Sequence, residues 1–202
     1  AKAGVSVVIL DRQEKAAKLL AQNLNDANHT AFSVYTDLSN NESCRKSIFE
    51  AIQMLGGLDI IVNNAAPARD PSMIGEMTNA NWAEHEQTVL GAVVNVVETG
   101  SKYLAMSSNA SVINISSTVS TSIAIDQCSW PYHISKAGLD HLTRWLAVKY
   151  GSLGIRVNAI APGLVNRYSS QNDQVNHERE LIIKTVIPLK RAGNGKDIAN
   201  TS

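Results

Sequence analysis

Five short runs rich in β-branched residues alternate with longer segments of helical periodicity, and this alternation restricts the fold of the chain more than any other feature. It is typical of an α/β domain whose parallel sheet lies between layers of helices. The predicted strands cover residues 5–10, 31–35, 58–62, 111–115 and 155–160, and the predicted helices cover 13–25, 42–55, 81–106, 132–150 and part of 173–186. Because crossovers between parallel strands are right-handed, we expect a doubly wound sheet in a three-layer α/β/α arrangement.

The composition is that of an ordinary globular chain, with 44% hydrophobic and 18% charged residues among 202. A chain of this length buries a sizeable core, and no internal repeat or linker divides it, so residues 1–202 are expected to form a single domain. Eighteen basic and eighteen acidic side chains cancel, and Lys and Arg form no long run. Nucleic acid is therefore not an expected partner, whereas a small molecule is.

The two cysteines, Cys44 and Cys128, fit neither a disulfide framework nor a pair of metal ligands close in sequence. This usage favours a reducing compartment, and the sequence predicts no metal site. No apolar run approaches the roughly 20 residues that a membrane helix needs, and the first residues lack the pattern of a signal peptide. We therefore expect a cytoplasmic protein that has no membrane partner.

Polar or turn-forming residues follow each predicted strand. They are Asp11, Asp37, Asn63 with Asn64, Ser116 with Ser117, and Pro162 with Gly163. In open parallel sheets, ligands bind in the crevice beyond the carboxyl ends of the strands. The five loops are therefore predicted to converge on one crevice.

Four motifs occur in order along the chain: NNAA at 63–66, ISS at 115–117, YHISK at 132–136 and RVNAIAPG at 156–163. A Tyr and a Lys four residues apart are weak evidence alone, but together the four motifs resemble the short-chain dehydrogenase/reductase family over essentially the whole chain. The resemblance implies a Rossmann-like fold and an enzyme that moves a hydride between a nicotinamide cofactor and a carbonyl or secondary alcohol substrate. It also implies a homodimer or homotetramer.

Three side chains have the chemistry that this reaction needs. A phenol exchanges protons poorly at neutral pH unless a neighbouring cation stabilises its phenolate. Tyr132 and Lys136 are four residues apart on a predicted helix, so both are expected to point into the crevice, with Lys136 as that cation. Ser117 is expected to hydrogen-bond the substrate oxygen, with Ser116 as the alternative hydroxyl. Taken singly, Tyr132 is more simply a packed aromatic and Lys136 a solvated cation, whereas together with the motifs they indicate catalysis.

Two adjacent residues at the end of the first predicted strand bear on the choice of cofactor. Asp11 is placed to accept hydrogen bonds from ribose hydroxyls and to repel a 2′-phosphate, which favours NAD. Arg12 acts in the opposite sense, because a guanidinium pairs with a 2′-phosphate, so NADP is the alternative. Asp11 also suits the start of the following helix as a cap.

The resemblance implies further cofactor contacts. Asp37 would accept a hydrogen bond from the adenine amine, and Leu38 would pack on the ring. Lys136 would hold the nicotinamide ribose beside Tyr132. The remaining residues that the resemblance places along the cofactor are Asn63, Ala65, Pro162, Gly163 and Val165. Asn63 with Asn64 is equally consistent with a simple turn.

The sequence departs from the family pattern at two internal positions. The family often has an Asn in the helix at 81–106 that joins a proton relay, and the corresponding position here is Thr88 or Val89, while Asn95 lies too late in the helix. The fourth member of the catalytic set is therefore not identified. Arg167 stands where the family commonly has a Thr beside the carboxamide, either facing an anionic substrate or solvated in a loop.

The glycine-rich turn of the family, GxxxGxG or GxGxxG, does not occur in the sequence. In this topology the strand before that turn lies in the middle of the sheet, so the strands at 5–10 and 58–62 are expected to lack a shared neighbour. We expect the chain to be part of a longer one, incomplete at both ends. By itself it is not expected to bind a dinucleotide appreciably, because a pyrophosphate needs the backbone N–H groups of such a turn.

Two other functions are compatible with the same fold. One is a non-catalytic dinucleotide-binding sensor, and the other is an enoyl reductase, which reduces a carbon–carbon double bond and need not use Ser117. The presence of Ser117, Tyr132 and Lys136 together favours carbonyl and alcohol chemistry.

Overall fold

Strands and helices alternate along the chain in the order that the sequence predicts, and their ends differ from the predicted ones by at most two residues. The computed structural model describes residues 3–68, 72, 74–76, 79, 81–166 and 173–201. Its elements are β1 (Val7–Asp11), α1 (Glu14–Asp26), β2 (Ala31–Tyr35), α2 (Asn41–Leu55), β3 (Ile60–Asn63), α3 (Trp82–His85), the π-helical segment η2 (Glu86–Gly91), α4 (Ala92–Leu104), β4 (Ser111–Ile115), the short 3₁₀ helix η3 (Thr118–Ser120), α5 (Trp130–Gly151), β5 (Arg156–Ile160), α6 (Asp173–Thr185) and α7 (Gly195–Ala199).

All the paired strands run parallel, but they form two separate sheets. One contains β1 and β2, and the other contains β3, β4 and β5 in that order. Within the described residues β1 pairs with β2, β3 pairs with β4, and no strand joins β1 to β3. The expectation that the first and third strands lack a shared neighbour is therefore confirmed.

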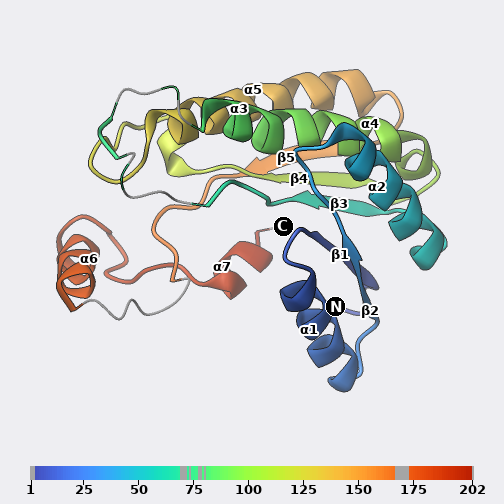
Figure 1. The fold of residues 1–202 in the computed structure, drawn as a ribbon, viewed down its shortest axis with the longest axis horizontal. Helices are drawn as coiled ribbons and strands as arrows, with labels where there is room; N and C mark the ends of the chain where they lie inside the picture. The colour runs from blue at the N-terminus through green and yellow to red at the C-terminus, as the bar shows by residue number, and fades with distance from the viewer. Residues whose placement is uncertain are drawn as a thin grey trace.

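Helices α3, α4 and α5 lie together over one face of the β3–β5 sheet, while α1 lies beside the β1–β2 pair (Figure 1). The core between the sheet and these helices contains fully buried side chains such as Val97, Val112 and Leu139. On β3 the exposure alternates: Ile61 is buried, but Ile60 and Val62 are 43% and 55% exposed. The helices described here thus cover one face of β3 and leave the other open.

Helix α2 joins the two sheets through its packing. It contacts α4 on one side and both β1 and β2 on the other. Asn40 caps its first turn by accepting a hydrogen bond from the backbone N–H of Ser43, and Gly56 ends it with a φ of 72°, a conformation that glycine adopts without strain. Its buried thiol, Cys44, belongs to the common core, and burial raises the pKa of that thiol to about 11.

The long helix predicted for 81–106 is interrupted by one π-helical turn, η2, between α3 and α4. A π-turn contains an extra residue, and each residue advances a helix by about 100°, so the side chains of α4 are rotated relative to a regular continuation of α3. Asn95 consequently faces α2, where its amide donates a 2.8 Å hydrogen bond to Asn41. Within the described residues, no helix combines the length and the apolar character needed to cross a membrane.

A chain of polar side chains crosses the core from β3 to α5. The amide of Asn63 donates to the side-chain oxygen of Asn114 at 2.8 Å, and the amide of Asn114 donates to the hydroxyl of Thr143 at 2.8 Å. Thr143 in turn donates to the carbonyl of Leu139. Because Asn114 is completely buried, these bonds replace its lost hydration and fix β3, β4 and α5 in register.

We expect Asn114→Leu to lower the free energy of unfolding by about 2 to 4 kcal/mol, since it leaves buried groups on two other elements without their partner. Urea titrations followed by far-ultraviolet circular dichroism would measure this loss. The exposed Asn109, in the turn before β4, provides the control: Asn109→Ala is expected to change stability by less than about 0.5 kcal/mol. Similar midpoints for both variants would contradict a structural role for the polar chain.

Candidate functional site

A cavity of about 390 Å³ opens at the carboxyl ends of β1, β2 and β3. Its lining comes from three loops and from one residue of η2: Leu10 to Gln13, Thr36 to Ser39, Asn64 to Ala68, and Thr88. The structure thus brings together four of the residues predicted to bind cofactor, Asp11, Asp37, Leu38 and Ala65. Asn63 is not part of this lining, because its side chain is directed into the core toward Asn114.

The two carboxylates of this cavity are held in place by short-range hydrogen bonds. Asp11 accepts from the backbone N–H of Gln13 at 2.8 Å. Gln13 itself is the N-cap of α1 and no side chain caps this helix, so the alternative that Asp11 is the cap is wrong. Asp37 accepts from the hydroxyl of Ser39 at 2.6 Å and from its backbone N–H at 3.0 Å. Both contacts hold the pKa of the Asp37 carboxyl below its ordinary value, and the hydroxyl contact has the larger effect. Asp37 is therefore an ionised acceptor at neutral pH.

Thr36 also lines the cavity, and it lies directly before Asp37. The residue is 1% exposed, and its hydroxyl has no hydrogen-bond partner. A buried polar atom without a partner costs free energy unless a ligand or water satisfies it. With two carboxylates, an unpaired hydroxyl and the apolar Leu38, the cavity has the donor, acceptor and packing groups that a nucleoside requires.

A second group of predicted residues lies at the carboxyl ends of β4 and β5 and does not belong to the described lining of the cavity. Lys136 is 2% exposed, and its ammonium donates a 2.6 Å hydrogen bond to the carbonyl of Ile115, the last residue of β4. The same ammonium lies 5.7 Å from the ring centroid of Tyr132. Helix α5 starts at Trp130, which places Tyr132 in its first turn and Lys136 one turn later on the same side.

The two adjacent serines after β4 have different environments. Ser116 is 3% exposed, and its hydroxyl donates to the carbonyl of Lys136 at 3.4 Å. Ser117 is half-buried, and its oxygen accepts from the backbone N–H of Val119. A hydroxyl that accepts a bond in this way keeps its own hydrogen as a separate donor. Ser116 is thus part of the packing between β4 and α5, and Ser117 is the more accessible of the two.

The loop after β5 lies beside Ser117. The backbone N–H of Thr118 donates to the carbonyl of Pro162 at 3.1 Å, and a Cβ added at Gly163 would lie 3.7 Å from the methyl of Thr118. Val165 pairs with Gly193, which attaches this loop to the segment before α7. Arg167, the position interpreted as either a substrate contact or a solvated residue, lies outside the described residues.

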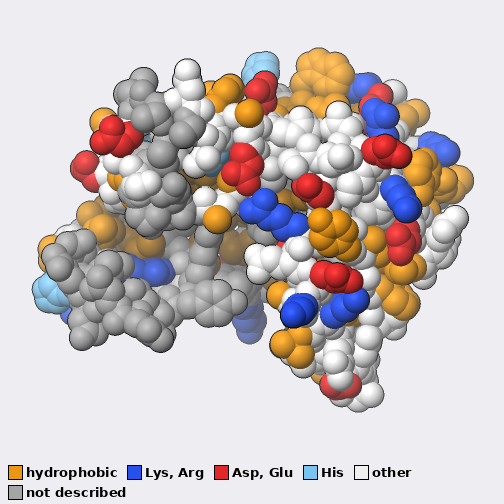
Figure 2. Space-filling view, viewed as in Figure 1, with side chains coloured by type: hydrophobic (Ala, Val, Ile, Leu, Met, Phe, Trp, Pro, Cys, Tyr) orange, Lys and Arg blue, Asp and Glu red, His pale blue; other side chains and the backbone are white. Residues whose placement is uncertain are grey.

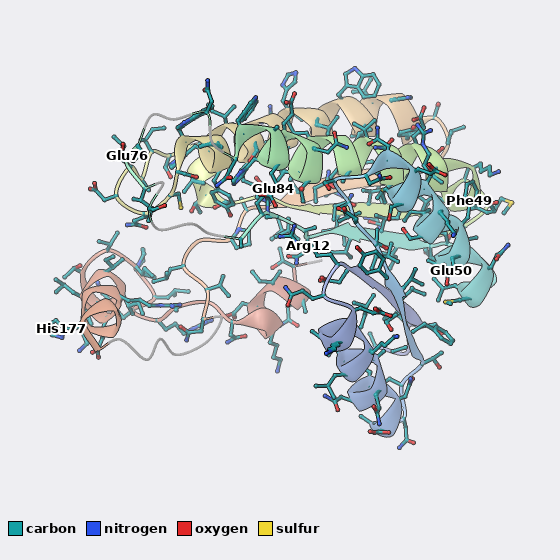
Figure 3. All side chains as sticks on the ribbon, in the orientation of Figure 1. Arg12, Phe49, Glu50, Glu76, Glu84 and His177 are labelled. Atoms are coloured by element: carbon teal, nitrogen blue, oxygen red, sulfur yellow. The ribbon has the colours of Figure 1, made fainter. Side chains whose placement is uncertain are left out.

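Helix α3 connects the two groups through two adjacent residues. Glu84 forms a 3.2 Å ion pair with Arg12 of the cavity lining (Figure 3). His85 packs edge to face against Tyr132 with ring centroids 6.4 Å apart. His85 is 6% exposed, and its Nδ1 lies 2.9 Å from the carbonyl of Asn81. A carbonyl only accepts, so Nδ1 carries the proton. No pattern in the sequence indicates these contacts, which join segments far apart in the chain.

Aromatic and imidazole side chains lie near Tyr132, around the first turn of α5. Trp82 of α3 stacks on Trp130 of α5, with centroids 5.4 Å apart and planes inclined by 22°. His133 is 8% exposed: its Nδ1 lies 3.0 Å from the carbonyl of Ser129, and its Nε2 accepts from the backbone N–H of Ala124 at 3.1 Å. These two bonds tie the stretch between Ser117 and Tyr132 to the first turn of α5.

The family often has an Asn of its proton relay at the position that is Thr88 or Val89 here. Val89 is 1% exposed and belongs to the core, whereas Thr88 lines the cavity. Asn95, which lies too late in the helix to match the relay Asn, faces α2. His85, which is not a residue of the family pattern, contacts the ring of Tyr132 from the start of this helix.

Comparisons with known proteins agree with this geometry. A family model described as enoyl-(acyl carrier protein) reductase matches residues 1–202. The 3-oxoacyl-[acyl-carrier-protein] reductase FabG of Staphylococcus aureus is 32% identical over 171 residues, which are 85% of this chain and 68% of that protein. Its counterpart in Chlamydia muridarum is 30% identical over 200 residues, 98% of this chain and 79% of that protein.

Solved structures give the same result. A putative short-chain alcohol dehydrogenase from Sinorhizobium meliloti 1021 superposes with a TM-score of 0.86 at 27% identity, covering 99% of this chain and 78% of that one. A 7α-hydroxysteroid dehydrogenase, in complex with NADH and 7-oxo glycochenodeoxycholic acid, gives a TM-score of 0.84 at 27% identity, covering 100% and 77%.

The fold and these comparisons define a nicotinamide-dependent oxidoreductase of the Rossmann-like α/β class. The chain belongs to the short-chain dehydrogenase/reductase family. It is a short-chain oxidoreductase, and the enoyl reductase alternative has no better support than carbonyl chemistry.

The contact between His85 and Tyr132 leads to a prediction for the full-length protein. Truncation by His85→Ala is expected to lower kcat by up to about tenfold while the affinity for cofactor changes little, because an edge-to-face contact contributes about 1 kcal/mol to holding the phenol ring. His85→Phe keeps a ring at this position and should retain most of the turnover. His141→Ala, at an exposed position of α5, is the control. If His85→Phe is as impaired as His85→Ala, packing of the ring is not the role of His85.

Proposed function

We propose that this protein reduces a carbonyl, or oxidises a secondary alcohol, with Tyr132 as the proton donor and acceptor. The observation that carries the proposal is the burial of the Lys136 ammonium 5.7 Å from the Tyr132 ring. A buried cation so close to a phenol stabilises the phenolate much more strongly than the same pair in water. Such an arrangement suits a phenol that gives and takes a proton during the reaction.

Each of the three side chains has one task in this reaction. Ser117 donates a hydrogen bond to the carbonyl oxygen of the substrate and so holds the carbonyl in place. Tyr132 gives its proton to that oxygen as the carbon is reduced, and Lys136 stabilises the phenolate that remains. A bound nicotinamide dinucleotide supplies the hydride. In the direction of oxidation, the phenolate of Tyr132 takes the proton from the alcohol.

The cavity at β1–β3 is proposed as the site of the adenosine half of the cofactor. Asp11 would accept from the ribose hydroxyls, and Asp37, which is ionised, would accept from the adenine amine while Leu38 packs on the ring. Thr36, whose buried hydroxyl has no partner, adds a donor and acceptor to the same cavity. NAD is the cofactor that Asp11 favours, with NADP as the alternative, and the steroid dehydrogenase of similar fold contains NADH.

The remaining residues are assigned along the cofactor on the family resemblance. Asn63 and Ala65 would present their backbone beside it, and Ala65 lines the cavity. Pro162, Gly163 and Val165 would border its nicotinamide end, next to Ser117 through the bond between Thr118 and Pro162. Lys136 would also hold the nicotinamide ribose.

In the full-length protein, Tyr132→Phe is expected to lower turnover at least about 100-fold, because it removes the proton donor without changing the ring. Its affinity for NADH should stay within about twofold, since the hydroxyl is assigned to the substrate. Absorbance of the nicotinamide during assays with a panel of ketones and alcohols measures turnover, and fluorescence titration measures affinity.

Lys136→Ala serves as the contrasting variant and should lose both turnover and affinity, because the ammonium is assigned to the phenolate and to the ribose. Tyr35→Phe, at a tyrosine 56% exposed on β2, is the control for removal of a phenol hydroxyl. Turnover of Tyr132→Phe within twofold of the unmodified protein would contradict the proposed mechanism.

We also propose that the protein is a homodimer or homotetramer assembled through α4 and α5. Three large apolar side chains lie exposed along α5: Ile134, Trp145 and Val148, at 53%, 54% and 85%. Val94 on α4 is 41% exposed. Figure 2 shows hydrophobic side chains at the upper edge of the molecule, over α5. An apolar surface of this kind is typical of a buried interface. We also propose a reducing, cytoplasmic environment, because Cys44 and Cys128 do not suit a disulfide framework.

Light scattering on the full-length protein is expected to give the mass of a dimer or a tetramer. Val148→Asp should shift the protein to a smaller species, because a carboxylate in the apolar interface would be buried without a partner. Leu19→Asp, at a residue 59% exposed on α1, makes the same change elsewhere and should leave the mass unaltered. An unmodified protein that is already monomeric would contradict the proposed assembly.

A further inference from the structure

The ion pair between Arg12 and Glu84 joins two parts of the chain that are 72 residues apart. Arg12 follows β1 and lines the cavity beside Asp11, whereas Glu84 belongs to α3. The guanidinium Nη1 lies 3.2 Å from Oε1 of Glu84, and the two side chains are 55% and 38% exposed. Figure 3 shows both side chains near the centre of the molecule, at the boundary between the β1–β2 unit and the helices above the other sheet.

Arg12 carries the only full positive charge among the described residues that line this cavity. A guanidinium in this place recognises a 2′-phosphate on the adenosine ribose when such a phosphate is present. Its partner Glu84 weakens this recognition of the 2′-phosphate in two ways. The carboxylate occupies one edge of the guanidinium fork, and its negative charge repels a phosphate that approaches the same guanidinium.

We propose that Glu84 is a specificity-determining residue that disfavours NADP by neutralising Arg12. The proposal rests on the proposed cofactor site and adds a residue to it that lies outside the four motifs. Asp11 repels the 2′-phosphate directly, while Glu84 acts through Arg12. The two carboxylates therefore disfavour the same phosphate from two different elements, and Arg12 is the residue on which the choice depends.

The size of the effect follows from the exposure of the pair. An exposed ion pair shifts an equilibrium by about fivefold at most, and the repulsion between Glu84 and the phosphate acts in the same direction. Removal of the Glu84 charge is therefore expected to tighten NADPH binding by about three- to tenfold. NADH has no 2′-phosphate, so its binding should change by less than about twofold. The shift should shrink at high salt, because exposed charges are screened.

The experiment uses the full-length protein and compares dissociation constants for NADH and NADPH by nucleotide fluorescence. The test variant is Glu84→Gln, and Arg12→Ala and the double variant accompany it. Glu180→Gln is the matched control, because Glu180 also forms an exposed ion pair, with Lys184 at 2.9 Å on α6, and its loss changes the net charge equally. The expected result is tighter NADPH binding in Glu84→Gln, with a clearly smaller gain when the same change is made in Arg12→Ala.

Three outcomes would overturn the proposal. An unchanged NADPH constant in Glu84→Gln would remove Glu84 from cofactor choice, and an equal gain in Glu180→Gln would show a general effect of net charge. A gain of the same size in the double variant, relative to Arg12→Ala, would show that Arg12 is not the intermediary. If the unmodified protein binds neither dinucleotide, the proposed function fails together with this inference, whereas normal binding of NADH with an unchanged preference overturns the role of Glu84 alone.

Discussion

The arrangement of the site depends on one buried charge, the ammonium of Lys136. Removing an ammonium from water is costly unless a polar group replaces the lost hydration. The carbonyl of Ile115 does so at 2.6 Å, at the point where β4 ends. This contact fixes α5 against the sheet and sets its rotation, which in turn places Tyr132 one turn earlier on the same side. Ser116 adds a second hydrogen bond between the end of β4 and α5, because its hydroxyl donates to the carbonyl of Lys136. Proton transfer by Tyr132, as proposed, therefore relies on an interaction that first of all positions a helix.

Helix α3 is only one turn long, yet it contacts both groups of site residues. Adjacent residues of a helix point about 100° apart, so Glu84 and His85 reach different neighbours. Glu84 contacts Arg12 at the adenosine end, and His85 contacts Tyr132 at the reacting end. A displacement of α3 would thus alter both ends together. The π-helical turn that follows allows α4 to pack its own buried face on the sheet without forcing α3 out of this position.

Local patterns predicted most of the fold, and the ordered motifs predicted which residues lie together at the carboxyl ends of β4 and β5. The strands at 31–35 and 111–115 were predicted correctly because β-branched runs of that length form few other structures. The π-turn was not predicted, because it arises from packing between α4, α2 and the sheet and leaves no periodic trace. The pairing of Glu84 with Arg12 and the contact of His85 with Tyr132 were also missed, since they join distant segments. The side-chain bond of Asn63 to Asn114, a partner 51 residues away, was also missed; it leaves the backbone of Asn63 available for its proposed place beside the cofactor.

The burial of Cys44 has a consequence for the chemical durability of the protein. Thiols react with oxidants and alkylating agents as thiolates, and a pKa of about 11 leaves almost none of this group ionised at neutral pH. The residue is also fully buried, so a reagent has no access while α2 stays packed on α4. Modification of Cys44 must therefore wait until these helices separate. Its rate of loss under oxidative stress is governed by the free energy of that opening rather than by the reactivity of the sulfur.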